Sequence, residues 1–575
     1  MVDRAQYFDL QYRAGLAINC LTRMIDKEQD YLPYFDVIYH AKPPLAQHIR
    51  WDYGDCTGRY VDALSLMRAM TGSKCNADID DKLIDLMLSF LGSKGLSWWK
   101  QAPFLTSNKS DQPGNVAELC WSQTSTFNAM TTLFLLTGND LYKEKAKQQV
   151  DGIAEVSLSK NGMRYYPLEA KKVGYDGDAI YPPHGWSEDQ MSRSGAFGAT
   201  VGVIIRSLMR FYKETGYELA AELACGFSKY ILNETKLYRE DGRFHDILEG
   251  HFYARVSSAL GILQVGLLLN KPEYVKFAEN VYKHAKEWGT SFGWFPEDLS
   301  SAQGCETCCT TEMIELAITL GRYVNPVYWN DAECFGRNQL FENQLLKVDW
   351  TDKLVEYPSR IPPFDSLRIT RENVMERVRG GFAGWSLVND WVSPVERIAH
   401  MMGCCHAHGA RALYDLWHYS ITESQDELSV NMLFTRASRS LDIRSSLPYK
   451  GKVEIHIKND SPLRIRIPSY VDKNNLRISL NGSQAVCECK GDWIRLGNLQ
   501  KGDNVLLLFN LPEREEEVFL GYKEYKVLYR GDTVMNIEPH GNIYPLYNRS
   551  ELIGKGDSDY LSPSNENCTD LASMP

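Results

Sequence analysis

The 575-residue chain has no long apolar run. No window of about 18 residues is both apolar and uncharged, so no membrane span is expected. There is no lysine- and arginine-rich run, and the formal net charge of −11 would repel a phosphate backbone. The phosphate-binding pattern G-x-x-x-x-G-K-[ST] is missing, and no glycine-rich turn follows a predicted strand. These absences argue against partners such as membranes, nucleic acids and nucleotides.

The N-terminal residues 1–20 also lack an apolar stretch after a basic start, so no secretion signal is predicted, although a trimmed one stays an alternative. The 14 cysteines lie mostly inside apolar helical patterns, as Cys20, Cys120 and Cys225 do. A reduced thiol behaves there as a small buried hydrophobic group. We therefore expect a cytoplasmic protein with free thiols.

The chain is long enough for two or three domains. Up to about residue 425, apolar residues recur at three- and four-residue spacing, which predicts helices. Segments 134–153, 211–231 and 267–287 repeat one design: a helix end, a Gly, Asn or Pro turn, and a second amphipathic helix. Repeated helical hairpins favour an α/α toroid over residues 1–425, with an α-solenoid as the alternative.

Residues 344–395 break the helical pattern with proline, glycine and alternation, which indicates an irregular or β excursion. After about residue 425 the period changes to two, and seven short alternating segments are separated by turn residues. We expect a β-sandwich over residues 426–555, followed by a polar tail over 556–575.

Two cysteine-containing segments carry the most specific chemical signal. Glu306 and Cys308 lie in GCETCC (304–309), and Cys404 and Cys405 are adjacent in MMGCCHAHG. One carboxylate and three thiols suit tetrahedral Zn²⁺, and both segments precede helical runs, whose N-termini favour thiolates. The alternatives are a purely structural zinc and cysteines that merely fill the core.

The E-x-C pair, the later C-C pair, the helical domain and the sandwich resemble glycoside hydrolase family 127, the β-L-arabinofuranosidases. The resemblance implies a zinc held by Glu306, Cys308, Cys404 and Cys405, with Cys404 also acting as the nucleophile. The implied reaction is a retaining hydrolysis that releases a furanosyl sugar, β-L-arabinofuranose first among them. Carbohydrate is the implied partner, and a homodimer is left open.

The acid/base of that family lies shortly before the metal-binding glutamate, so Glu297 is the candidate and Asp298 the second choice. The interval from Glu297 to Glu306 is shorter than the family's, and Glu297 alternatively solvates a loop. The resemblance further implies substrate-binding roles, with a structural role as the alternative for each residue: His251, Trp51, Asp55 and Gln123.

Two other functions remain open from the sequence. One is another toroid enzyme acting on sugars, such as a lyase or an epimerase with Tyr or His as its base. The other is a non-catalytic carbohydrate-binding protein with a structural zinc. Both predict that Cys404 is not a nucleophile.

Overall fold

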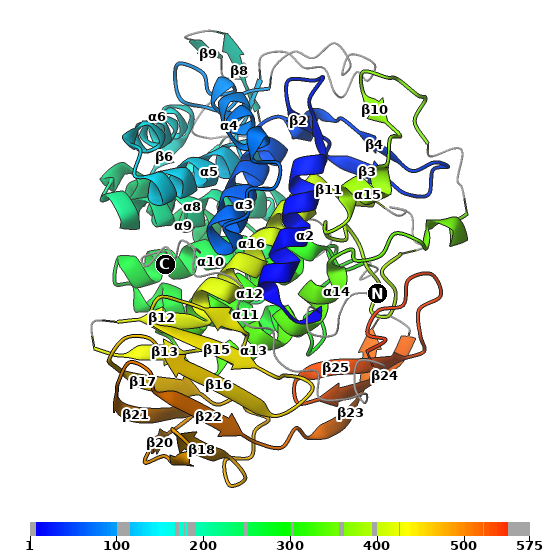
Figure 1. Ribbon diagram of the computed structural model, residues 1–575. Coiled ribbons are helices and arrows are strands. Elements are labelled where there is room, and N and C mark those ends of the chain that lie inside the picture. Colours follow the sequence, from blue (N-terminus) through cyan, green and yellow to red (C-terminus); the bar gives the residue numbers. More distant parts are fainter. Residues whose placement is uncertain are drawn as a thin grey trace.

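The computed structural model describes residues 7–99, 116–166, 172–176, 179–181, 191–245, 251–300, 304–355, 361–393, 400–424, 426–520 and 523–549. Helices make up most of the described residues up to Tyr419, and strands follow; Figure 1 shows the change from blue and green coils to yellow and orange arrows. Among the described residues, none of the helices has the length and apolar character needed to cross a bilayer.

Six long helices of the described chain form a closed ring, because each packs against the next and the last packs against the first. They are α3 (Asp55–Thr71), α5 (Trp121–Thr137), α8 (Ile204–Thr215), α10 (Phe252–Leu268), α12 (Thr307–Tyr323) and α16 (Gly403–Tyr419). α10 is buried almost all round, as expected for a helix between two layers.

A second helix packs against each helix of the ring. In ring order from α3 to α16 these are α4 (Asp80–Ser89), α6 (Asp140–Val156), α9 (Glu218–Asn233), α11 (Pro272–Lys286), α13 (Tyr328–Phe335) and α2 (Leu10–Arg23). The remaining helical segments are short: η1 (Arg50–Asp52), η2 (Ala77–Ile79), α7 (Gly195–Gly202), the π-helix η5 (Gly336–Leu340), α14 (Phe341–Asn343), η6 (Thr351–Lys353) and α15 (Val374–Val378).

The three repeated segments do form helical hairpins, namely α5–α6, α8–α9 and α10–α11. Each turn contains a residue with positive φ: Gly138 at 67°, Gly216 at 69° and Asn270 at 53°. Glycine and asparagine adopt this left-handed conformation at the least cost, and it ends a helix. The recurring turn residue is therefore the physical basis of the repeat.

Two sheets after α16 enclose an apolar core of their own. The first contains β12 (Ile421–Glu423), β13 (Leu428–Val430), β17 (Ser461–Arg466), β21 (Trp493–Leu499) and β20 (Glu488–Lys490), in that spatial order. The second contains β14 (Arg436–Ala437), β15 (Leu441–Ser445), β16 (Lys452–Ile457), β22 (Asn504–Leu508), β18 (Arg477–Leu480) and β19 (Ser483–Gln484). All seven segments with period two thus contain strands.

A third sheet packs into the core of the helical part instead. It is made of β23 (Glu513–Leu520), β24 (Lys523–Arg530) and β25 (Thr533–Glu538), and Figure 1 shows it beside the other two. Arg549, which follows it, donates from Nε to Glu342 Oε1 at 2.6 Å. Asn338 Nδ2 donates to the Asp532 carbonyl at 2.8 Å. The last strands are therefore bonded to α14 and η5. The predicted tail, 556–575, lies outside the described residues.

Other short strands brace the loops at the ends of the ring helices. One sheet has the order β10 (Ile369–Thr370), β4 (Leu45–Gln47), β3 (Asp36–Ile38) and β11 (His400–Met402). The others are β1 (Ile25–Asp26) with β2 (Leu32–Pro33), β6 (Leu158–Lys160) with β7 (Met163–Tyr165), and β5 (Val116–Glu118) with β8 (Lys172–Asp176) and β9 (Ala179–Tyr181). Strand β10 belongs to the predicted excursion over 344–395.

A buried histidine braces the loop just before α3. His48 lies 2.7 Å from Asp52 through Nδ1 and 3.2 Å from Asp26 through Nε2, and its ring stacks on Tyr34 at 4.1 Å. Burial alone would lower the pKa of His48, but hydrogen bonds to the two carboxylates outweigh it and raise that pKa. The loop carries Trp51, so this cluster supports a candidate sugar contact.

We expect His48→Gln to lower the melting temperature by about 2–4 °C at pH 6.5 and by less at pH 9. Because the folded pKa of His48 is raised, its stabilisation is complete below the unfolded value of about 6.5 and is lost as pH rises through the folded pKa. Differential scanning fluorimetry at both pH values measures the shift. Lys27→Gln, at an exposed ion pair with Asp78, is the control with little expected change. If His48→Gln lowers the melting temperature equally at both pH values, the stabilisation does not come from a charged His48.

Candidate active site

The two cysteine-containing segments meet at the N-termini of neighbouring ring helices, as predicted. Glu306 directly precedes α12, and Cys404 is the second residue of α16. The ligand atoms of Glu306, Cys308, Cys404 and Cys405 all lie within 4.8 Å of one another. Cys405 Sγ lies 3.8 Å from Cys308 Sγ, 4.0 Å from Cys404 Sγ and 3.7 Å from Glu306 Oε1.

Strand pairing positions the second half of this cluster. β11 runs antiparallel to β3 with Met402 opposite Asp36, and the Gly403 N–H donates to the Phe35 carbonyl at 2.6 Å. Residue 403 must be glycine-sized, since a Cβ there would lie 2.4 Å from Cys56 Sγ. The turn from β11 into α16 therefore places Cys404 beside α3.

The thiols of the cluster differ in environment. Glu306, Cys308 and Cys405 are buried, whereas Cys404 is half-buried. Hydrogen bonds from Cys308 and Cys405 lower the pKa of Cys404 to about 6, and burial raises the pKa of both donors well above the usual value. All 13 cysteines of the described residues are free thiols.

His251 connects the cluster to Glu297. Its Nε2 lies 3.0 Å from Glu306 Oε2 and 3.7 Å from Glu297 Oε1. Burial would lower the pKa of His251, but the negative charge of Glu306 and its hydrogen bond raise it to about 9. His251, Glu306 and Cys309 also form a second group of possible ligands. The direct contact of His251 is thus with a cluster carboxylate, which it orients.

Backbone pairing explains how the short interval from Glu297 to Glu306 still brings the two side chains together. The Glu297 N–H donates to the Gly304 carbonyl at 3.0 Å, and its own carbonyl accepts from Phe252 N–H at 2.9 Å. Trp385 Nε1 donates to Glu297 Oε2 at 2.5 Å. The neighbouring Asp298 instead binds the backbone and side chain of Ser300, both at 2.8 Å.

Most of the predicted site residues line one cavity of about 360 Å³. The lining includes Trp51, Asp55, His251, Glu297, Glu306, Cys308 and Cys404. Cys405 lies behind Cys404, in the buried part of the cluster. A cavity of this size, lined by thiols, carboxylates and indoles, fits a small polar ligand such as one sugar ring.

The structure does not bring Gln123 to this cavity. Its side chain is fully buried and bonds to the backbone of Ser97 and Glu118 at 2.7–2.9 Å and to Gln149 at 2.7 Å. The position follows from its place on α5, where the side chain meets α6 and the loop that contains Ser97. Gln123 therefore holds two helices and a loop together.

Other cavity residues were not singled out from the sequence: Arg59, Trp121, Tyr253 and Trp385. The only available signal for Arg59 was its spacing of four residues from Asp55 on one helix, which makes their side chains neighbours. Trp385 comes from the excursion over 344–395, whose Ser386 pairs with Cys305. A pairing so distant in the chain leaves no local pattern.

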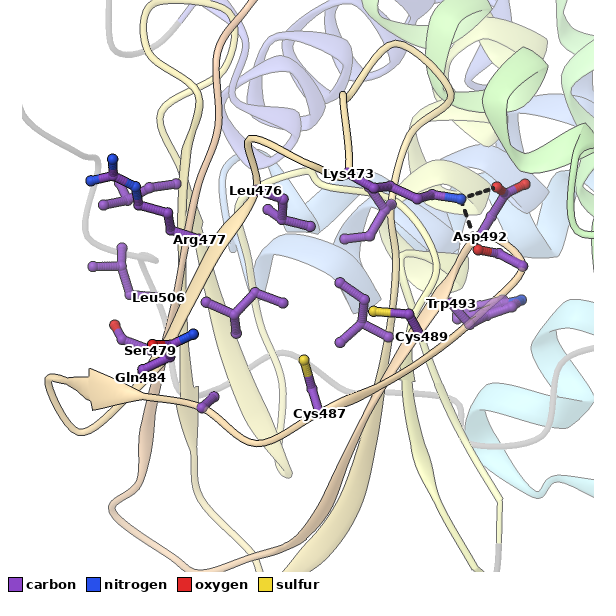
Figure 2. A pocket seen from close by; sticks show the side chains of 16 residues that line it. Lys473, Leu476, Arg477, Ser479, Gln484, Cys487, Cys489, Asp492, Trp493 and Leu506 are labelled. Atoms are coloured by element: carbon purple, nitrogen blue, oxygen red, sulfur yellow. Dashed lines mark hydrogen bonds and ion pairs between the residues drawn. The ribbon is translucent and has the colours of Figure 1, made fainter.

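A second cavity, of about 510 Å³, opens between the two sheets of the sandwich (Figure 2). Its lining mixes aliphatic with polar and charged side chains, and its acidic residue, Asp492, is paired with Lys473 at 3.0 Å. The thiols of Cys487 and Cys489 also line it, but among the described residues they belong to no group of possible metal ligands, and the lining has no second carboxylate. The chemistry of glycoside hydrolysis therefore points to the first cavity.

The four-residue cluster fits a zinc ion by its donor chemistry. It offers one carboxylate oxygen and three sulfurs, a set and number that Zn²⁺ prefers. The His251 N–H on Glu306 is the kind of outer contact that orients a ligating carboxylate.

Comparison with solved structures identifies a class of fold: that of the glycoside hydrolase family 127 β-L-arabinofuranosidases. One such enzyme, from Geobacillus stearothermophilus T6, aligns with a TM-score of 0.56 at 15% identity, over 84% of this chain and 77% of its own. A GH127 β-arabinofuranosidase aligns at 0.58 and 13% identity, over 92% and 81%. A structure described as a glycoside hydrolase aligns at 0.58 and 12%, over 89% and 84%.

No family model matches the sequence, and no curated protein matches it either. At these identities the likeness establishes the fold. The resemblance to family 127, or to a divergent relative of it, is confirmed at that level.

Proposed function

We propose that this chain is a retaining glycoside hydrolase that releases a furanosyl sugar, first of all β-L-arabinofuranose, from a non-reducing end. One observation carries the proposal: the Cys404 thiol and the Glu297 carboxyl line the same cavity, with the cluster of Glu306, Cys308 and Cys405 adjoining it. The shared fold of the family 127 structures supports the same conclusion.

In the first step, Cys404 Sγ donates an electron pair to the anomeric carbon while the bond to the leaving oxygen breaks. Glu297 gives its proton to that oxygen. In the second step Glu297 takes a proton from water, whose oxygen attacks the anomeric carbon and displaces the sulfur. Two inversions at one carbon retain its configuration.

Glu306, Cys308, Cys404 and Cys405 would hold the zinc. When bound, the ion keeps its cysteine ligands deprotonated at neutral pH. The protein's own groups perform the remaining tasks: His251 orients Glu306, and the Trp385 N–H fixes the Glu297 carboxyl.

We also propose a division of the chain into two domains. The closed ring and its second layer support an α/α toroid over residues 1–425, and the two-sheet core supports a β-sandwich within 426–555. The free thiols support a reducing, cytoplasmic location.

Elemental analysis tests the metal. We expect about one zinc per purified chain, and at least about a tenfold lower affinity in Cys308→Ala, because removing one of four ligands leaves an open site. Cys489→Ala, at an exposed cysteine of β20, is the matched control. If the wild type contains no metal, or if Cys308→Ala and Cys489→Ala bind zinc equally well, the zinc assignment is wrong.

Hydrolysis of p-nitrophenyl β-L-arabinofuranoside and of a panel of other furanosides tests the activity. Release of nitrophenol that requires zinc supports the proposal. If the protein contains zinc but hydrolyses no furanoside, the metal-site assignment stands and the proposed activity is wrong.

A further inference from the structure

The side chain of Arg59 is more than nine-tenths buried, yet it lines the cavity that contains Cys404 and Glu297. It projects from the first turns of α3, next to Asp55. The site as proposed above assigns no role to this guanidinium, although a buried cation usually has a defined set of partners.

Two contacts fix the orientation of the guanidinium. Nε donates to Asp55 Oδ1 at 2.7 Å, and Nη1 lies 2.6 Å from His408 Nε2. Because arginine has only donors, His408 accepts this bond as a neutral imidazole. The Tyr253 ring lies 5.8 Å below the guanidinium carbon. Arg59 is therefore preorganised rather than free to swing.

Asp55 is held as firmly. Ser125 Oγ donates to its Oδ1 at 2.6 Å. The contact requires that α3 and α5 approach closely at Gly58, where a Cβ would lie 2.7 Å from the Ser125 backbone carbon. Packing of two ring helices thus sets the position of the Asp55–Arg59 pair.

The pair has hydrogen-bonding capacity left over. Within the described residues, Arg59 Nη2 donates to no protein atom and Asp55 Oδ2 accepts from none. Neither atom is among the enclosed, unpartnered polar atoms of the described chain, so both remain accessible. An adjacent donor and acceptor of this kind match two neighbouring hydroxyl groups, one of which accepts while the other donates.

The charge of the cavity selects among ligands that carry such hydroxyls. Besides the acid Glu297, three carboxylates line it, on Asp36, Asp55 and Glu306, against the cations of Arg59 and His251. Asp55 already balances Arg59. The remaining excess of negative charge repels a sugar acid, so a neutral sugar is favoured.

We propose that Arg59 and Asp55 together bind two adjacent hydroxyl groups of a neutral sugar ring in this cavity. The inference rests on the proposed glycosidase function and specifies its substrate class. Arg59 is the new member of the pair, and its role is substrate binding: it supplies the donor that distinguishes a sugar with both hydroxyls from its deoxy analogues.

Binding without turnover tests the pair first. Saturation-transfer NMR titration with methyl 1-thio-β-L-arabinofuranoside, a thioglycoside that resists hydrolysis, compares wild type, Arg59→Gln and Arg59→Lys at pH 7. We expect about 10- to 100-fold weaker binding to Arg59→Gln, since a charged donor is lost, and incomplete recovery in Arg59→Lys, which cannot keep both fixed contacts. Arg68→Gln, on the same helix but bonded to Asp80, is the control with unchanged binding.

Deoxy substrates separate recognition from a general structural role. The substrates are p-nitrophenyl β-L-arabinofuranoside and its 2-deoxy and 3-deoxy analogues. For one of the two analogues, the kcat/KM of the wild type should fall by about the same factor as the kcat/KM of Arg59→Gln falls on the parent sugar. The two losses should not add when combined, because they remove the same hydrogen bond. Fully additive losses for both analogues, or unchanged sugar binding in Arg59→Gln, would overturn the inference.

The outcomes also separate this inference from the proposed function. If the wild type hydrolyses furanosides but Arg59→Gln binds the sugar equally well, the glycosidase function stands and the role of the Arg59–Asp55 pair is wrong. If sugar binding depends on Arg59 but the wild type hydrolyses no furanoside, the role of the pair stands and the glycosidase function is wrong. A wild type that binds no neutral furanoside overturns the pair as stated.

Discussion

Serine in place of Cys404 lowers kcat/KM for a β-L-arabinofuranoside by about 10⁴-fold or more, with the far-UV circular dichroism unchanged. The loss has this size because the hydroxyl is far less nucleophilic than a thiolate and the site offers no substitute at the same position. Steady-state kinetics measure the loss, and Cys489→Ser is the control that retains wild-type turnover.

Because Cys404 is both a proposed ligand and the proposed nucleophile, activity alone does not separate the two roles. Mass spectrometry of the wild type, quenched during turnover and digested, should show a pentosyl adduct on the peptide that contains Cys404. An adduct on any other residue, or near-normal turnover in Cys404→Ser, contradicts the assignment of the nucleophile.

Glu297→Gln should lower kcat/KM by about 10²- to 10⁴-fold while the zinc content stays that of wild type. The amide keeps the Trp385 contact at the carboxyl oxygen but has no proton to give to the leaving group. The loss should be smaller for p-nitrophenyl leaving groups, which need little protonation, and larger for alkyl glycosides. Added azide, which needs no general base, should accelerate the second step in this variant.

Asp298→Asn is the matched control for Glu297→Gln. Its carboxylate closes a turn on Ser300, so the substitution should leave turnover within a few-fold of wild type. If instead Asp298→Asn is the inactive variant and Glu297→Gln the active one, the two assignments must be exchanged.

The elements that the sequence predicted well are those specified by local physics. Apolar spacing and left-handed turn residues such as Gly138 and Gly216 define helical hairpins within a short window. The placement of both cysteine-containing segments before helices is equally local. Their meeting at one point required the complete ring of helices, and the resemblance to a known family supplied that.

The features that sequence reasoning missed depend on which surfaces meet. Arg59 and Gln123 are both buried polar residues on ring helices, and no periodicity shows that the first lines a cavity while the second joins α5 to α6. Likewise, the β-sandwich expected over residues 426–555 included residues 513–538, and no local pattern shows that the strands there enter the helical core instead.

The membership of β23–β25 in the helical core has a consequence for synthesis on the ribosome. Residues 532–549 add buried partners to Glu342 and Asn338, which also bond to Tyr7 and Cys334 respectively. The helices that carry the cysteine cluster emerge long before those residues do. A nascent chain arrested before residue 530 therefore holds its ring helices without the contacts that residues 532–549 supply.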